Sequence, residues 1–152
     1  MEKTPENSIN QRMAVISTLA KRLIQRVIVS AGLTITPDQW SVLSYMWHKD
    51  GLSIGKIAEY SKKEFSNITR IVEKLERNGY VEKRRNEADS RSWQVYLLPK
   101  AYTIRDVVTS LQRQTMQQSL KGISEEHQRV MLEAFEKMES NIMEQMDRLE
   151  KV

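Results

Sequence analysis

The hydrophobic residues at both ends of this chain recur at steps of three and four. One such seam follows Thr4-Pro5 and another follows Ser124. The seam near the N-terminus consists of Ile9, Met13, Ile16, Ala20, Leu23 and Val27. The seam near the C-terminus consists of Met131, Phe135, Met138, Ile142, Met146 and Leu149. This spacing predicts two long helices, each of which needs another helix against its apolar side, and Thr4 and Ser124 are the expected N-caps.

Between the seams the pattern predicts shorter elements. Residues 36–39 (Thr-Pro-Asp-Gln) have the composition of a capping box that begins a second helix. Asp50-Gly51 ends that helix and Ser53 caps a short third one. A fourth helix is expected over about 64–78, with Asn78-Gly79 as a left-handed stop. Its apolar stripe consists of Ile68, Ile71, Val72 and Leu75.

A β-hairpin and a further helix complete the pattern. The segments VEKRR (81–85) and WQVYLL (93–98) read as strands joined by the polar loop NEADSRS. Pro99 begins a helix that reaches about Lys121. The expected fold class is therefore mainly α with a small β-hairpin (α+β). We expect a single domain over 1–152, with a winged helix-turn-helix core at 36–98 and dimerisation helices at 5–31 and 99–150.

Composition excludes several classes of protein. Hydrophobic residues make up 39% of the 152 residues and charged residues 29%, as in a globular chain. The absence of cysteine excludes disulfides and thiolate metal sites. His48 and His127 are far apart, and neither a phosphate-binding glycine loop nor a nucleophile motif is present. We therefore expect a cytoplasmic protein that is not an enzyme, has no cofactor or metal, and does not enter a membrane.

The charge is unevenly distributed along the chain. The net charge is +4; residues 53–91 carry ten basic and seven acidic side chains, and residues 122–152 carry four and eight. A basic middle favours a polyanion partner, because bound phosphates release condensed counterions. A solvated surface of mixed sign would give the same numbers, so charge alone does not decide.

The predicted fourth helix has a polar face opposite its apolar stripe. A helix of this kind fits the major groove of duplex DNA, which is about 12 Å wide, and its N-terminal half reads base edges. The base-reading candidates are Ser66, Asn67, Thr69 and Arg70. The phosphate-binding candidates are Lys62, Lys63 and Lys74. Glu73 is expected to pair with Arg70 or Arg77, the alternative being that it accepts a hydrogen bond from cytosine. An ordinary surface helix would have the same division into polar and apolar faces. What makes the signal specific for DNA binding is the order of the predicted elements around this helix.

The predicted hairpin supplies a basic wing. Arg84 and Arg85 lie at its base and Arg91 lies near its tip. An arginine at such a tip can enter a narrow A·T minor groove, where the negative potential is concentrated. Asp89 is expected to orient Arg91 through a charged hydrogen bond. The alternative for both is a solvated turn.

These residues resemble the MarR family of bacterial winged-helix regulators. The resemblance is carried by TPDQW at 36–40, by FSNITRIVEKLERNGYVEKRR at 65–85, and by Asp89 with Arg91. It implies a homodimer built through the first and last two helices, with the fourth helices in successive major grooves of double-stranded DNA and the wing arginines in flanking minor grooves. Two departures are the turn at 61–65 (Ser-Lys-Lys-Glu-Phe), which has no glycine, and Leu97-Leu98, where the family often has Leu-Thr.

The terminal seams support the same assembly from the residues alone. A second copy would cover them, although they could also pack within one subunit, and two-fold dimers are the commonest assembly. We expect a transcriptional regulator, a repressor, that binds a pseudo-palindromic operator and is released by a small aromatic or phenolic effector. The candidates for an effector pocket are Trp40, Tyr45, Trp47 and Met116, although plain core packing is the favoured interpretation of each residue taken singly. The rival hypothesis is a helical adaptor whose winged core binds protein.

Overall fold

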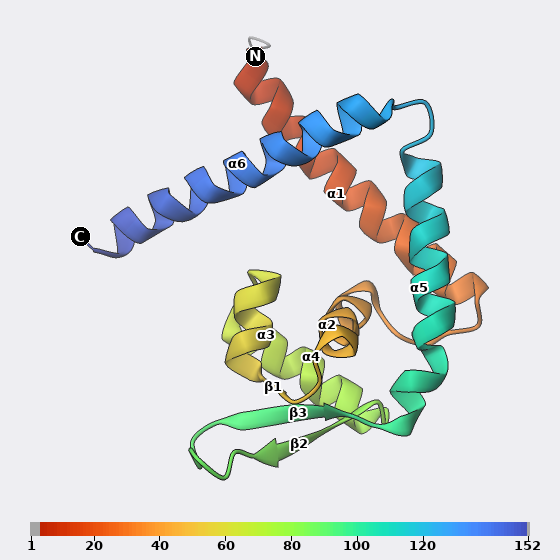
Figure 1. Ribbon diagram of the computed structural model, residues 1–152, viewed down its shortest axis with the longest axis vertical. Helices are drawn as coiled ribbons and strands as arrows, with labels where there is room; N and C mark the ends of the chain where they lie inside the picture. The colour runs from red at the N-terminus through yellow and green to blue at the C-terminus, as the bar shows by residue number, and fades with distance from the viewer. Residues whose placement is uncertain (1–3, 152) are drawn as a thin grey trace. The chain divides into compact units, whose positions relative to one another are not determined.

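The computed structural model describes residues 4–151, which form six α-helices and three β-strands (Figure 1). The helices are α1 (Pro5–Ser30), α2 (Pro37–His48), α3 (Ile54–Ser61), α4 (Phe65–Arg77), α5 (Pro99–Ser119) and α6 (Glu125–Glu150). The strands are β1 (Leu52–Ser53), β2 (Val81–Arg85) and β3 (Trp93–Leu97). The chain divides into two units, Met1–Arg113 and Gln114–Val152, with the division inside α5. The mainly helical fold class expected from the sequence is confirmed.

The helices begin at the caps that the sequence predicted. Thr4, Ser53 and Ser124 each accept a hydrogen bond from the backbone N–H three residues on, at 3.3, 3.1 and 3.2 Å. At α2 the box is reciprocal: Gln39 N–H donates to the Thr36 hydroxyl (3.2 Å), and Thr36 N–H donates to Gln39 Oε1 (2.9 Å). These side chains satisfy backbone donors that no helix can satisfy internally.

The sheet has one strand more than the hairpin that was predicted. Its order is β1-β3-β2, with all pairs antiparallel, and the hairpin register runs from Val81 opposite Leu97 to Arg85 opposite Trp93. β1 places Leu52 opposite Val95. A two-residue strand is too short to show a period in the sequence, so only its tertiary pairing reveals it.

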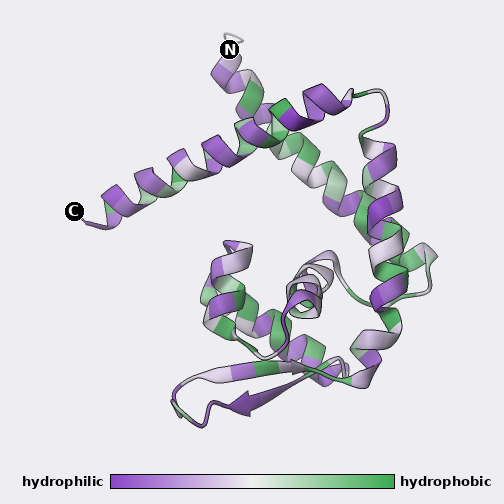
Figure 2. Ribbon diagram, in the orientation of Figure 1, coloured by the Kyte–Doolittle hydropathy of each residue, from purple (hydrophilic) through white to green (hydrophobic). Residues whose placement is uncertain are grey.

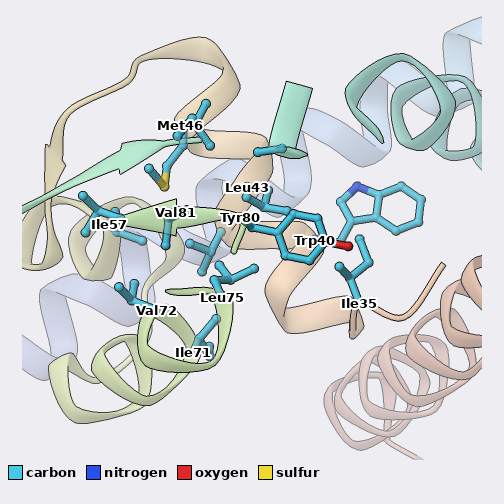
Figure 3. Packing of buried hydrophobic residues seen from close by; sticks show 14 of the residues in the cluster. Ile35, Trp40, Leu43, Met46, Ile57, Ile71, Val72, Leu75, Tyr80 and Val81 are labelled. Carbon is cyan, nitrogen blue, oxygen red and sulfur yellow. The ribbon is translucent and has the colours of Figure 1, made fainter. Parts of the chain in front are cut away.

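One core lies among α2, α3, α4 and the hairpin (Figure 3). All four residues of the α4 stripe are buried, and Ile68, Val72 and Leu75 are fully so. Figure 3 shows Leu43 and Met46 of α2, Ile57 of α3 and Val81 of β2 among the buried side chains that pack around α4. This packing holds α4 by its apolar stripe and leaves the opposite side open to solvent.

The seams of the long terminal helices are exposed. In α1, Ile9, Ile16 and Leu23 are 51%, 60% and 43% exposed, and of its residues only Ile28 is buried. In α6, considered by itself, no residue is buried. Figure 2 shows hydrophobic positions recurring along both helices. Within residues 4–151 no helix is long and apolar enough to cross a bilayer.

Candidate nucleic-acid interface

The face of α4 opposite the core carries the predicted base-reading residues. Ser66 and Arg70 are exposed, while Asn67 and Thr69 are half-buried at the edges of this face. Thr69 Oγ1 donates to the carbonyl oxygen of Phe65 (2.9 Å), so its hydroxyl hydrogen is used within the helix. The N-cap residue, Glu64, makes no side-chain capping hydrogen bond, although its carbonyl oxygen accepts the N–H of Asn67 (3.0 Å).

The turn before α4 contains no glycine, and a lysine adopts the left-handed backbone conformation there. Lys62 takes the left-handed conformation (φ 55°, ψ 29°) as the C-cap of α3. Such a φ is uncommon for a residue with a Cβ atom. Lys63, predicted to bind phosphate, has its ammonium 3.2 Å from Asp38 Oδ1 at the start of α2. The Lys63 charge is thus already partly neutralised within the protein, whereas Lys74 is exposed.

The expected pairing of Glu73 is wrong. In residues 4–151 no ion pair joins Glu73 to Arg70 or Arg77. All three side chains are exposed, and holding two long side chains together in water costs about as much entropy as the pair returns. Arg70 is therefore left with its guanidinium donors open.

The base of the wing is braced by aromatic rings. The Arg85 guanidinium lies 5.2 Å from the centre of the Trp93 ring, its cross-strand partner, and Lys83 Nζ lies 5.8 Å from the same ring. On the other face, the Arg84 guanidinium lies 4.5 Å from the Tyr96 ring and also pairs with Glu82. Cation–π contacts of this kind limit where long basic side chains can swing. Two aromatic residues of β3 therefore fix the positions of three cations.

The tip of the wing is a tight turn built on Asp89. Asp89 Oδ1 accepts the backbone N–H of Arg91 (3.0 Å), and the Asp89 carbonyl accepts the N–H of Ser92 (3.0 Å). The expected charged hydrogen bond between Asp89 and Arg91 is therefore made to the backbone N–H of Arg91, as an Asx turn, because the short Asp side chain reaches the amide two residues on. Among residues 4–151 the Arg91 guanidinium has no hydrogen-bond or ion-pair partner.

A carboxylate that the sequence reasoning missed ties the wing to α4. Glu76 Oε2 accepts the backbone N–H of Lys83 (2.7 Å), and Glu76 Oε1 lies 3.7 Å from Lys83 Nζ. β2 is an edge strand, so this amide would otherwise lack a partner in the sheet. No sequence signal reveals this, since Glu76 looks like any surface acid on a helix.

An open cleft of about 360 Å³ lies in the first unit. Its lining residues are Ile24, Pro37, Trp40, Ser41, Ser44, Tyr45, His48 and Gln112. Trp40 and Tyr45 line it as predicted, but Trp47 does not, and Met116 belongs to the second unit. The indole nitrogen of Trp47 is buried without a partner among the described residues. His48, which is exposed, also lines this cleft.

One pair on α3 has shifted pKa values. The Lys56 ammonium donates to Glu59 Oε2 at 2.7 Å, which holds the pKa of Glu59 below and that of Lys56 above the ordinary value. Both side chains are exposed, so the pair adds little stability. It leaves Lys56 with a compensated charge.

The segment that contains α4 and the wing is similar to known proteins. The model of the MarR family matches residues 35–93, which run from the start of α2 through the wing into β3. The winged segment belongs to the MarR family. An uncharacterised HTH-type transcriptional regulator of Bacillus subtilis (strain 168), YsmB, is 21% identical over 143 residues, 94% of this chain and 91% of the relative.

Solved structures extend the likeness beyond the MarR segment. A MarR protein from Peptoclostridium difficile superposes with a TM-score of 0.86 at 16% identity, covering 95% of this chain and 94% of the other. A MarR transcriptional regulator from Methanosarcina mazei Go1 gives 0.79 at 21% identity, covering 91% and 98%. Reduced AbfR, in a structure bound to DNA, gives 0.76 at 19% identity, covering 90% and 94%. At these identities the likeness establishes a shared fold that includes the terminal helices.

Proposed function

We propose that this protein is a transcriptional regulator that binds double-stranded DNA through α4 and the wing. The observation that carries the proposal is the exposed Arg70 and Ser66 face of α4, held from behind by a buried stripe, together with a wing on which Arg91 has no hydrogen-bond or ion-pair partner among residues 4–151. A rigid helix with open donors is what base reading requires. The solved structure of AbfR on DNA, which shares this fold, supports the same use.

Roles within this face follow from side-chain chemistry. Arg70 suits guanine and Asn67 suits adenine, each through two hydrogen bonds, and Ser66 can serve either. Lys62 and Lys74 supply phosphate contacts, while Lys63 would have to leave Asp38 to do so. Arg91 enters the minor groove, and the braced Arg84 and Arg85 hold the adjoining backbone.

We also propose that the protein is a homodimer and that it acts as a repressor of transcription. The exposed seam of α1 and the unburied α6 need a partner, and a second copy provides it. Two copies related by a two-fold axis would bind half-sites about one helical turn apart. Sedimentation at micromolar concentration tests this: a monomer would contradict the dimer without touching the DNA proposal.

The cleft supports the proposal that a small-molecule effector regulates the protein. Its volume of about 360 Å³ falls within the range of small-molecule sites, and Trp40 and Tyr45 favour an aromatic compound of phenolic type. Ser41, Ser44 and His48 add polar partners. Such a ligand shifts DNA binding only if it prefers one conformation of the protein. Titrating phenolic compounds into the protein–DNA complex tests this.

The experiment that tests DNA binding is selection from random duplexes, followed by affinity measurements across salt. Inverted repeats and a steep loss of affinity with salt are expected. Arg70→Ala should lose affinity for the selected site by about ten- to a hundredfold and little for random duplex, whereas Lys74→Ala should weaken both alike. If no duplex binds in dilute buffer, the adaptor hypothesis replaces this one.

A further inference from the structure

Phe65 is an apolar side chain that the core does not use. It is the first residue of α4 and is 59% exposed, although the buried stripe of the same helix begins three residues later at Ile68. In the winged segment the other large exposed apolar groups are Tyr60, whose ring lies 6.2 Å from that of Tyr45, and Trp93, which contacts two cations. Among the described residues no ring or cation contact involves Phe65.

Thr69 extends this apolar surface by one turn. Residues four apart on a helix are neighbours, so Thr69 lies beside Phe65. Because the Thr69 hydroxyl donates to the Phe65 carbonyl oxygen, the remaining outer part of its side chain is the methyl group. Phe65 and Thr69 thus form an apolar edge of α4, next to the polar edge of Ser66 and Arg70.

The charges around this apolar edge indicate which class of partner contacts it. Around Phe65 the turn and the helix carry Lys62 and Arg70, together with Lys63, which pairs with Asp38, against one exposed acid, Glu64, so the balance is positive. A polyanion is the partner that such flanks favour. Within the major groove of DNA, the apolar group among the base edges is the C5-methyl of thymine, and phenylalanine and the threonine methyl are side chains that contact it.

We propose that Phe65, together with Thr69, reads thymine methyl groups in the half-site and is a specificity-determining residue. The inference rests on the proposed function, because it needs α4 in the major groove. The N-terminal turn of such a helix lies nearest the base edges, and Phe65 begins that turn. The expected effect is the burial of about one methyl group against the ring, which corresponds to about three- to fivefold in affinity for each thymine read.

The test replaces thymine by uracil, one position at a time, in the selected site. Uracil lacks the C5-methyl but keeps the base pair, so the substitution removes only the apolar contact. The wild-type protein should lose about three- to fivefold in affinity at one or two positions of each half-site. Phe65→Ala should bind the thymine site more weakly and show a clearly smaller loss at those positions, because only the Thr69 methyl remains, whereas Phe65→Leu should retain more of the loss.

A second exposed aromatic residue, outside the winged segment, provides the matched control. Tyr102 on α5 is 44% exposed and lies outside the winged segment, so Tyr102→Ala removes an exposed aromatic ring and should keep the wild-type uracil pattern. Equal affinity of the wild type for thymine and uracil at every position would overturn the inference while leaving DNA binding intact. An unchanged uracil pattern in Phe65→Ala would overturn it as well. Failure of every duplex to bind would instead refute the proposed function.

Discussion

Replacing Glu76 with alanine should loosen the attachment of the wing to α4. In the structure its carboxylate accepts the backbone N–H of Lys83 at 2.7 Å and lies 3.7 Å from the Lys83 ammonium. A hydrogen bond to a charged group contributes about 1.5–3 kcal/mol. The ion pair adds about 0–1 kcal/mol, and less here because the Glu76 side chain is 38% exposed. We expect Glu76→Ala to lower the free energy of unfolding by about 2 kcal/mol.

Glu76→Gln is the matched control. Its amide oxygen can still accept the Lys83 N–H, but the charge is gone. The loss should therefore be under about 1 kcal/mol. Urea unfolding at one fixed protein concentration measures both variants, since the stability of an oligomer depends on concentration. An unchanged slope with denaturant would show that only stability has changed.

Glu76→Ala should also change the contribution of the wing to DNA affinity. If Glu76 positions the wing, the loss of affinity caused by Arg91→Ala should be smaller in the Glu76→Ala background than in the wild type, because a loosened wing already contributes less. Strictly additive losses would show that the wing acts independently of this link. Equal unfolding free energies for wild type and Glu76→Ala would refute the structural reasoning altogether.

Two further variants test the core and the braced wing. Leu75→Ala, at a fully buried position of α4, should cost about 2–5 kcal/mol of unfolding free energy in urea, and a cost below about 1 kcal/mol would contradict the tight packing. Trp93→Leu should weaken duplex binding by about two- to fivefold, because Arg85 loses the ring that holds it; the same loss in an Arg85→Ala background would show that Trp93 acts by another route.

Local signals accounted for most of the elements. The caps at Thr4, Ser53 and Ser124, the box at α2 and the stop at Gly79 act within four residues of chain. The stripe of α4 likewise follows from helical periodicity alone. These features could be read from the sequence because each one satisfies backbone groups or buries apolar surface in its own neighbourhood.

The candidate site was recovered less completely. The exposed positions of Arg70 and Ser66 match the prediction. Their roles toward DNA stay predictions. The Glu73 pairing was wrong, because exposed charges gain little by pairing. The charged hydrogen bond of Asp89 is made to the backbone N–H of Arg91, which its short side chain reaches easily.

The sequence by itself determined where the helices and the hairpin begin and end and which face of α4 is buried. Only the tertiary structure decided that Lys63 meets Asp38, that Asp50 accepts the N–H of Leu97 across 47 residues, and that Glu76 caps the edge of β2. The physical reason is the range of the interaction. Caps and periodicity act along a few residues of chain, whereas these contacts depend on which surfaces meet once the core has formed.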